Sequence, residues 1–282
     1  MQPAPTLPPD PKFPNPMGAK YQRTEGICLR RVDYSNTSQV ATFLTPDRGR
    51  LSFMAKGVKR APKKGIKTSF DLLCRYELVF TEPLYGSLYN LTKRQLTDDF
   101  RDIRRSLRAI ICAYYAAELM LNFTMEEEPC RELYSVLIQV LRMFGSGENL
   151  ALGALLLEIE VLRHHGSLPV FGICAECESS VAGQDQVFFS PARGGALCPR
   201  CRETEQAGMR GIPAQTAHLA LLDRLSEHRP SRPDRVSIDL GQVRSMSRLS
   251  RHMIQFVLGK QLRMWDYRLF EGPESLRKAG RH

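Results

Sequence analysis

The sequence lacks any apolar run long enough to cross a membrane. Its richest apolar stretch, residues 150–162, is interrupted by Glu158 and Glu160 and is too short to span about 30 Å of hydrocarbon. No basic and apolar leader of the signal-peptide type opens the chain. We therefore expect a cytoplasmic protein without a membrane partner. In that compartment its eight cysteines serve as thiols or metal ligands and not as disulfides.

The sequence also lacks the motifs of the common enzyme classes. No P-loop, GxSxG or HExxH motif occurs, so ATP-driven or hydrolytic chemistry has no candidate site. Asp98, Asp99 and Asp102 could form the carboxylate cluster of a two-metal nuclease. Their place at an expected helix start, with Thr97 as the N-cap, makes capping the better interpretation. We therefore predict that the protein is not an enzyme.

What the sequence has in excess is positive charge. Its 282 residues include 40 Lys and Arg against 30 Asp and Glu, which gives a formal net charge of +10. The apolar and charged fractions are those of an ordinary globular protein, and they exclude wholesale disorder. A positive excess favours a polyanionic partner, but it also serves solubility.

The excess is concentrated in residues 48–67, a segment without a single acidic residue. Eight like charges without counter-charges repel one another, so an anionic partner is favoured over a solvated loop, and we expect nucleic acid. No base-reading element is evident, so binding should be largely indifferent to sequence. The basic residues are Arg48, Arg50, Lys56, Lys59, Arg60, Lys63, Lys64 and Lys67.

Residues 24–92 alternate between apolar and polar side chains, a pattern typical of strands with one buried face. Five short strands are expected, at about 26–32, 38–45, 50–56, 70–80 and 87–91, separated by turn-forming clusters. Without a crossover helix they suit a small closed barrel. A barrel with a basic loop resembles an OB-fold, which binds single strands partly by stacking, here on Phe53, Tyr85 and Tyr89.

From Thr97 onward the hydrophobic period becomes 3.6 residues, which predicts helices. The first helix should bury one stripe of Phe100, Ile103, Leu107, Ile110, Tyr114, Ala117 and Leu121. A second follows at about 133–144 and a third at about 152–162, ending at Gly166. Two more are expected at about 216–227 and 245–259.

The most specific motif is a pair of CxxC sequences, Cys174–Cys177 and Cys198–Cys201, separated by 20 residues. This is the spacing of a zinc ribbon, because each CxxC turn directs two thiolates at one point and zinc takes four ligands tetrahedrally. Four thiolates leave no open position for water, so we expect one structural Zn²⁺ per chain. Four unmetallated thiols are the alternative.

These patterns predict an α+β multidomain chain with an N-terminal OB-fold β-barrel, a central and C-terminal helical bundle, and an inserted four-Cys zinc ribbon. The expected parts are a disordered Pro-rich tail (1–20), the barrel (21–95), the first part of the helical domain (96–170), the ribbon (171–211), the last part of the helical domain (212–270) and a tail (271–282).

The order of these parts resembles the RecO family of DNA repair and recombination proteins. The resemblance rests on FLTPDRGRL at 43–51 and AKGVKR at 55–60 in the barrel, then LYNLT at 88–92. It continues with residues 157–166, Leu168-Pro169 and the first CxxC pair. No one string is decisive, but their order and spacing are specific.

The resemblance implies binding of single- and double-stranded DNA, annealing of complementary strands, and work with RecR to load RecA onto DNA covered by single-stranded-DNA-binding protein (SSB). It implies that the helical domain docks the C-terminal tail of SSB, and that the protein acts at the bacterial nucleoid in the cytoplasm. Arg48, Arg50, Lys56, Lys59 and Arg60 match the basic barrel strings. The alternative is an RNA-binding zinc-ribbon and OB protein of ribosome or transcription complexes.

Overall fold

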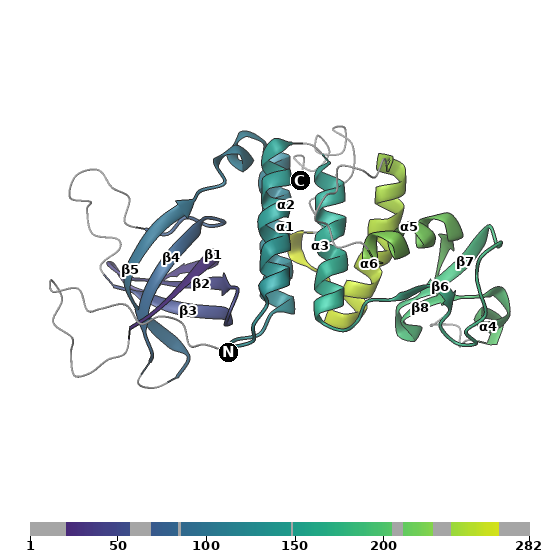
Figure 1. The fold of residues 1–282 in the computed structure, drawn as a ribbon, viewed down its shortest axis with the longest axis horizontal. Helices are drawn as coiled ribbons and strands as arrows, with labels where there is room; N and C mark the ends of the chain where they lie inside the picture. The colour runs from purple at the N-terminus through teal and green to yellow at the C-terminus, as the bar shows by residue number, and fades with distance from the viewer. Residues whose placement is uncertain are drawn as a thin grey trace, which may run out of the picture. The chain divides into compact units, whose positions relative to one another are not determined.

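The computed structural model describes residues 21–56, 69–83, 86–147, 149–204, 211–227 and 238–264, which are mixed α and β (Figure 1). The described residues fall into two compact units. The barrel unit comprises those up to Arg101 together with Thr124–Ser135, and the helical unit comprises Asp102–Phe123 and those from Val136 onward. The expected tails, 1–20 and 271–282, lie outside the described residues. No helix within these ranges is long and apolar enough to cross a membrane.

The barrel closes in the order β1-β2-β3-β5-β4, which confirms the predicted fold class. The β3–β5 pair is parallel, and the other neighbours are antiparallel. The strands are β1 (Tyr21–Asp33), β2 (Gln39–Thr45), β3 (Gly49–Ala55), β4 (Arg75–Thr81) and β5 (Leu88–Asp98).

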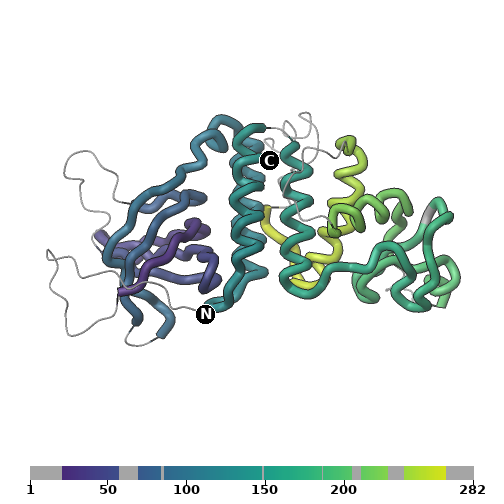
Figure 2. The backbone as a smooth tube through the Cα atoms, in the orientation of Figure 1, coloured from purple at the N-terminus to yellow at the C-terminus, as the bar shows by residue number. Residues whose placement is uncertain are grey.

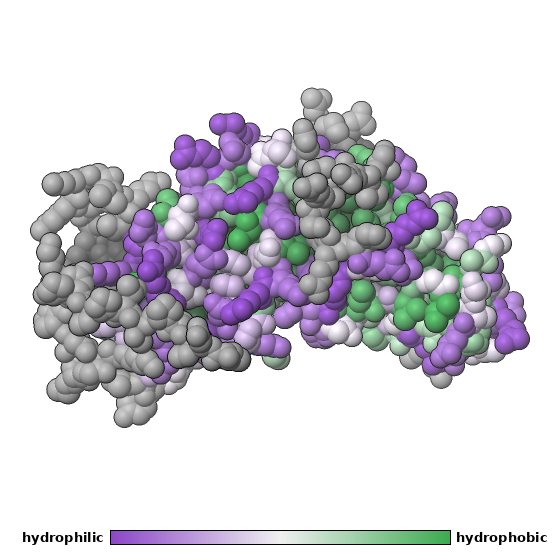
Figure 3. All heavy atoms as spheres, viewed as in Figure 1, coloured by the Kyte–Doolittle hydropathy of each residue, from purple (hydrophilic) through white to green (hydrophobic). Residues whose placement is uncertain are grey.

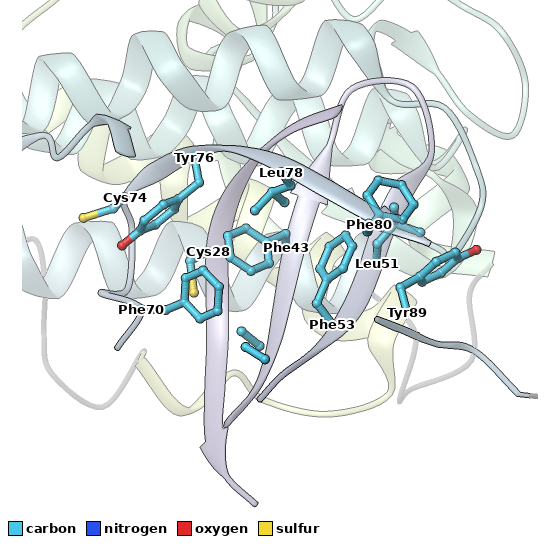
Figure 4. Packing of buried hydrophobic residues seen from close by; sticks show 12 residues of the cluster. Cys28, Phe43, Leu51, Phe53, Phe70, Cys74, Tyr76, Leu78, Phe80 and Tyr89 are labelled. Carbon is cyan, nitrogen blue, oxygen red and sulfur yellow. The ribbon is translucent and has the colours of Figure 1, made fainter. Parts of the chain in front are cut away.

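The interior of the barrel is aromatic. Phe43 makes edge-to-face contacts with Phe53, Phe70 and Tyr76 at centroid distances of 5.6, 5.1 and 5.9 Å. Figure 4 shows these rings gathered between the strands. Phe53 is fully buried and Tyr89 is 6% exposed, so neither offers a face to a base, and the predicted stacking role of both is wrong. Tyr85 lies outside the described residues.

Two predicted boundaries in the barrel unit are also wrong. β4 begins at Arg75 and not at Phe70, because Leu73 adopts a left-handed φ of 60° and its N–H donates to the Cys28 carbonyl at 2.8 Å. β5 runs through Thr97, whose hydroxyl bonds to the Arg75 carbonyl at 3.0 Å, so Thr97 caps no helix.

The residues after β5 form a short 3₁₀ turn, η1 (Arg101–Arg105), before the first α-helix. Asp98 and Asp99 accept the backbone N–H groups of Phe100 and Arg101 at 2.9 and 3.2 Å. These carboxylates therefore do satisfy backbone donors, at a 3₁₀ turn and not at an α-helix.

The helical unit is built around a helix that is buried on nearly every side. Its helices are α1 (Leu107–Phe123), α3 (Leu150–His164), α5 (Thr216–Glu227), α6 (Leu240–Leu258) and the part of α2 (Arg131–Ser146) from Val136. The twelve residues from Ala151 to Leu162 of α3 are all buried, and α3 packs against α1, α5 and α6. A Cβ on Gly153 would lie 3.0 Å from the Phe144 ring, so a small residue lets α2 and α3 approach closely here.

The predicted apolar stripe of the first helix is confirmed only in part, since Phe100, Ile103 and Ala117 are buried but other members are not. Leu107 is 65% and Tyr114 is 40% exposed, while Ile111, Tyr115 and Leu119 are buried. The helix begins at Leu107, about ten residues after the expected start, and ten of its residues are buried.

A buried carboxylate lies among the helices. Glu158 of α3 is fully buried and accepts hydrogen bonds from the Tyr115 hydroxyl at 2.8 Å and from Arg251 Nε at 3.0 Å. The Ser250 hydroxyl donates to its second oxygen. The charge of Glu158 is thus paired and hydrogen-bonded, as burial requires.

The ribbon is a four-stranded sheet in the order β6-β8-β7-β9. Its elements are β6 (Val170–Cys174), β7 (Gln186–Ser190), the 3₁₀ turn η2 (Pro191–Arg193), β8 (Gly195–Leu197), α4 (Pro199–Thr204) and β9 (Ile212–Gln215). The backbone leaves the helices after α3, forms the ribbon and returns into α5 and α6 (Figure 2). The visible surface of the described residues is largely hydrophilic, with hydrophobic areas that include one over the ribbon (Figure 3). Among the ribbon residues, Val170 and Ile173 of β6 are 45% and 40% exposed.

Candidate metal centre and nucleic-acid interface

The four ribbon cysteines converge on one point. The sulfur atoms of Cys174, Cys177, Cys198 and Cys201 all lie within 4.8 Å of one another, and those of Cys177 and Cys198 are 3.9 Å apart. Four ligands at about 2.3 Å from a tetrahedral ion would be about 3.8 Å from each other. The spacing therefore fits a metal ion bound by four sulfurs, and the four cysteines predicted from the sequence could hold it.

The backbone forms the two CxxC turns with its own hydrogen bonds. In the first turn, Glu178 N–H donates to the Cys174 carbonyl at 2.9 Å, and Glu178 takes a left-handed φ of 58°. In the second, Arg202 N–H donates to the Cys198 carbonyl at 3.0 Å. Cys198 N–H also donates to the Cys174 sulfur at 3.4 Å, which joins the two turns and favours a negatively charged sulfur.

Hydrogen bonding at the site favours the thiolate of Cys177, the form that binds metal. The Ser179 side chain lies 3.1 Å from the Cys177 sulfur and lowers its pKa to about 6. The side-chain contact with Cys177 raises the pKa of Cys201 to about 12.

The other cysteines are of a different kind. Cys28, Cys112 and Cys130 are buried away from the ribbon, and desolvation raises the pKa of each to about 12. Cys74 is buried as well. All four are core residues. Cys28, Cys112 and Cys130 are protonated at neutral pH, because burial raises the pKa of each.

Only part of the predicted nucleic-acid interface lies within the described residues. Lys56 is exposed directly after the last residue of β3, and Arg50 is half-buried on the strand face opposite the buried Leu51 and Phe53. Five of the predicted residues lie outside the described ranges, namely Lys59, Arg60, Lys63, Lys64 and Lys67.

Arg48 is held in a network on the barrel unit. Its Nε donates to Glu127 Oε2 at 2.8 Å, and its Nη2 donates to the Tyr89 hydroxyl at 2.8 Å. The guanidinium also lies 5.1 Å from the centroid of the Tyr89 ring, and the Tyr89 hydroxyl donates to Glu127. The Arg48 side chain is 25% exposed, so its charge is partly neutralised before any ligand binds.

An acidic segment, Met125–Glu128, lies directly over the β2–β3 turn in the same unit. Gly49 has a φ of +56°, and a Cβ there would lie 2.4 Å from the carbonyl oxygens of Met125 and Glu128. Arg50 N–H donates to the Met125 carbonyl at 2.9 Å. At Arg48, an acidic partner that the neighbouring sequence lacks is therefore supplied from this distant segment.

Sequence reasoning missed Glu127 as a partner of the basic segment. The run of three glutamates, Glu126–Glu128, is visible in the sequence, but nothing local connects it to a strand turn 79 residues away. Only the fold of the barrel unit brings the two together.

Comparison with known proteins covers nearly the whole described chain. The family model for "Recombination protein O N terminal" matches residues 17–100, and that for "Recombination protein O C terminal" matches residues 104–266. A DNA repair protein RecO from Syntrophus aciditrophicus is 28% identical over 242 residues, which is 86% of this chain and 92% of that protein. Proteins with the same name from Moorella thermoacetica and Rhodopirellula baltica are 33% identical over 180 residues (64% of this chain, 66% of that protein) and 32% identical over 202 residues (71% and 72%).

Proposed function

Because the chain belongs to the RecO family of DNA repair proteins, we propose that it is a non-enzymatic mediator of recombinational repair that binds single- and double-stranded DNA and anneals complementary strands. With RecR it helps to load RecA onto DNA covered by SSB, whose C-terminal tail it binds. It works in the cytoplasm at the nucleoid. The observation that carries this proposal is the basic face of β3, where Arg50 and exposed Lys56 lead into the acid-free segment.

Annealing needs a surface and not an active site. Two strands repel each other through their phosphates, and a basic surface that neutralises both lowers this repulsion. Contacts to phosphate carry no sequence information, so the strands remain free to search for their register. The burial of Phe53 and Tyr89 supports binding through the backbone and not through stacked bases on these two rings.

Reversing three charges, with Lys56→Glu, Lys59→Glu and Arg60→Glu in one chain, should lower both single-strand affinity and annealing rate at least about tenfold at low salt. Loss of three phosphate contacts should also reduce the salt slope of single-strand binding, log K against log salt, by about 2. Fluorescence anisotropy with a labelled single-stranded oligonucleotide measures the affinity and its salt dependence. Complementary strands that carry a fluorophore and a quencher measure the annealing rate.

The matched control reverses three charges on the helical unit, Arg108→Glu, Arg142→Glu and Lys260→Glu. It changes the net charge equally and should leave annealing within about twofold, since a distant charge acts mainly through screened long-range steering. Unchanged annealing in the first variant would contradict the proposal. Tighter binding of RNA than of DNA of matched sequence would favour the RNA-binding alternative.

Removing an acidic charge near Arg48 should have the opposite effect and raise the affinity for single strands. A phosphate that binds Arg48 must displace the Glu127 carboxylate, so Glu127→Gln should tighten single-strand binding. Because Glu127 is about half exposed, the gain should be about two- to fivefold, the range of a surface ion pair. Glu128→Gln makes the same change in net charge one residue away, and it should have the smaller effect. Equal gains in the two variants would attribute the change to net charge alone.

The ribbon, we propose, binds one zinc ion held by Cys174, Cys177, Cys198 and Cys201. Four sulfur ligands in a tetrahedral arrangement suit zinc, and a complete shell of thiolates leaves no place for a reacting water. The role of the metal is then to hold the two CxxC turns together, which fixes the ribbon.

A further inference from the structure

The helical unit contains a groove between β9, the start of α5 and the first half of α6. Its volume is about 380 Å³. The side chains that line it include Gln215 from β9, His218 from α5, and Arg244, Ser245, Arg248 and Leu249 from α6. No acidic side chain is among its lining residues.

The structure sorts the arginines of α6 into two kinds. Arg251 is paired with the buried Glu158, so its charge is used inside the unit. Arg244 and Arg248 are exposed, lie one helical turn apart, and both line the groove. Arg248 Nη2 donates to the Pro213 carbonyl of β9 at 2.7 Å, which anchors the guanidinium at the groove while other N–H donors stay available.

The donors of this groove match a phosphodiester. Two guanidinium groups can each bind phosphate oxygens through paired N–H groups, and a hydroxyl, an amide and an imidazole add further donors beside them. Arginine, serine and glutamine side chains are the groups that proteins use on the nucleic-acid backbone. Leu249 and Ala214, both buried, form an apolar floor that offers nothing to read a base edge.

We infer that this groove binds the phosphate backbone of a nucleic-acid strand and is a second strand site, additional to the basic face of the barrel. The inference rests on the proposed function, because annealing brings two strands together and a second site would let one chain hold both. An acidic peptide could also bind the same two arginines through its carboxylates. The hydroxyl, amide and imidazole donors beside them favour a phosphate chain, whose oxygens can accept from all of these groups, over a peptide with apolar side chains.

The experiment uses the full-length chain with Arg244→Glu and Arg248→Glu, a labelled oligothymidine strand, and a separate pair of complementary strands. Native mass spectrometry counts the strands bound per chain. We expect the wild type to bind two strands and the variant one. The variant should keep first-strand affinity within about twofold, and its annealing rate should fall about tenfold or more.

Two control variants accompany this experiment. Arg244→Glu alone leaves the Arg248–Pro213 hydrogen bond in place and should produce a partial loss, with a far-ultraviolet circular dichroism spectrum unchanged from the wild type. Arg142→Glu with Lys260→Glu makes the same change in net charge and should leave the strand count unchanged. Two bound strands and normal annealing in the groove variant would overturn the inference, as would a wild-type groove that binds an acidic apolar peptide without displacing DNA. A wild-type chain that binds no DNA would overturn the proposed function as well.

Discussion

Replacing Arg251 with methionine is expected to lower the free energy of unfolding of the helical unit by about 3–5 kcal/mol. Glu158 would remain fully buried on α3 with its Tyr115 and Ser250 hydrogen bonds but without a cation. Breaking a buried ion pair by removing one partner is costly because the other charge loses its compensation and cannot return to water. Urea unfolding followed by far-ultraviolet circular dichroism measures the loss.

A double variant separates the cost of the orphaned charge from the value of the pair. Glu158→Leu together with Arg251→Met removes both charges, and it should recover most of the stability, since apolar residues often replace a buried pair at little cost. Lys260→Met, which removes an exposed cation just beyond α6, should change the stability by less than about 0.5 kcal/mol. If Arg251→Met alone also stayed within this limit, the network would have no role in stability.

The barrel could be predicted from the sequence because each strand buries one face. β3 and β4 alternate strictly between buried and half-buried residues, so a period of two survives in the sequence. The prediction failed where backbone geometry and not burial sets the boundary. The left-handed Leu73 delays the start of β4, although the alternation of apolar side chains continues through it.

The helices α1 and α3 show why a stripe of apolar residues can mislead. A hydrophobic stripe has a phase only when one side of a helix faces solvent. All twelve residues from Ala151 to Leu162 are buried, two glutamates among them, and α1 buries ten of its residues. Such sequences show that a helix is buried without showing which face meets which neighbour.

The two candidate sites also differ in how far the sequence could predict them. The cysteines could be assigned because two local motifs each place two sulfurs, and only their mutual approach was left to the fold. Arg48 was assigned from a basic sequence window, but its partner Glu127 comes from a distant segment packed over the β2–β3 turn. Charge counted along the chain therefore overstates the charge that is available in space.

Replacing Cys177 and Cys201 with serine should reduce the bound zinc from about one ion per chain to none and unfold the ribbon. Zinc bound by a cysteine-rich structural site contributes about 10–16 kcal/mol, and the few buried side chains of the ribbon, such as Val187 and Phe189, cannot replace it. Elemental analysis measures the metal, and hydrogen exchange of the β7 and β8 amides measures the fold.

The matched control is Cys28→Ser with Cys112→Ser, which removes two cysteines from the cores of the two units and should leave the zinc content unchanged.

A thiol reagent gives an independent count of the cysteines that hold the metal. After chelation the ribbon sulfurs should react, whereas Cys28, Cys112 and Cys130 should stay unreactive at neutral pH, because burial both covers them and raises the pKa of each to about 12. Full metal content in the ribbon variant would show that these four sulfurs do not hold the ion. Because the barrel belongs to the other compact unit, loss of the ribbon should leave binding of the first DNA strand intact.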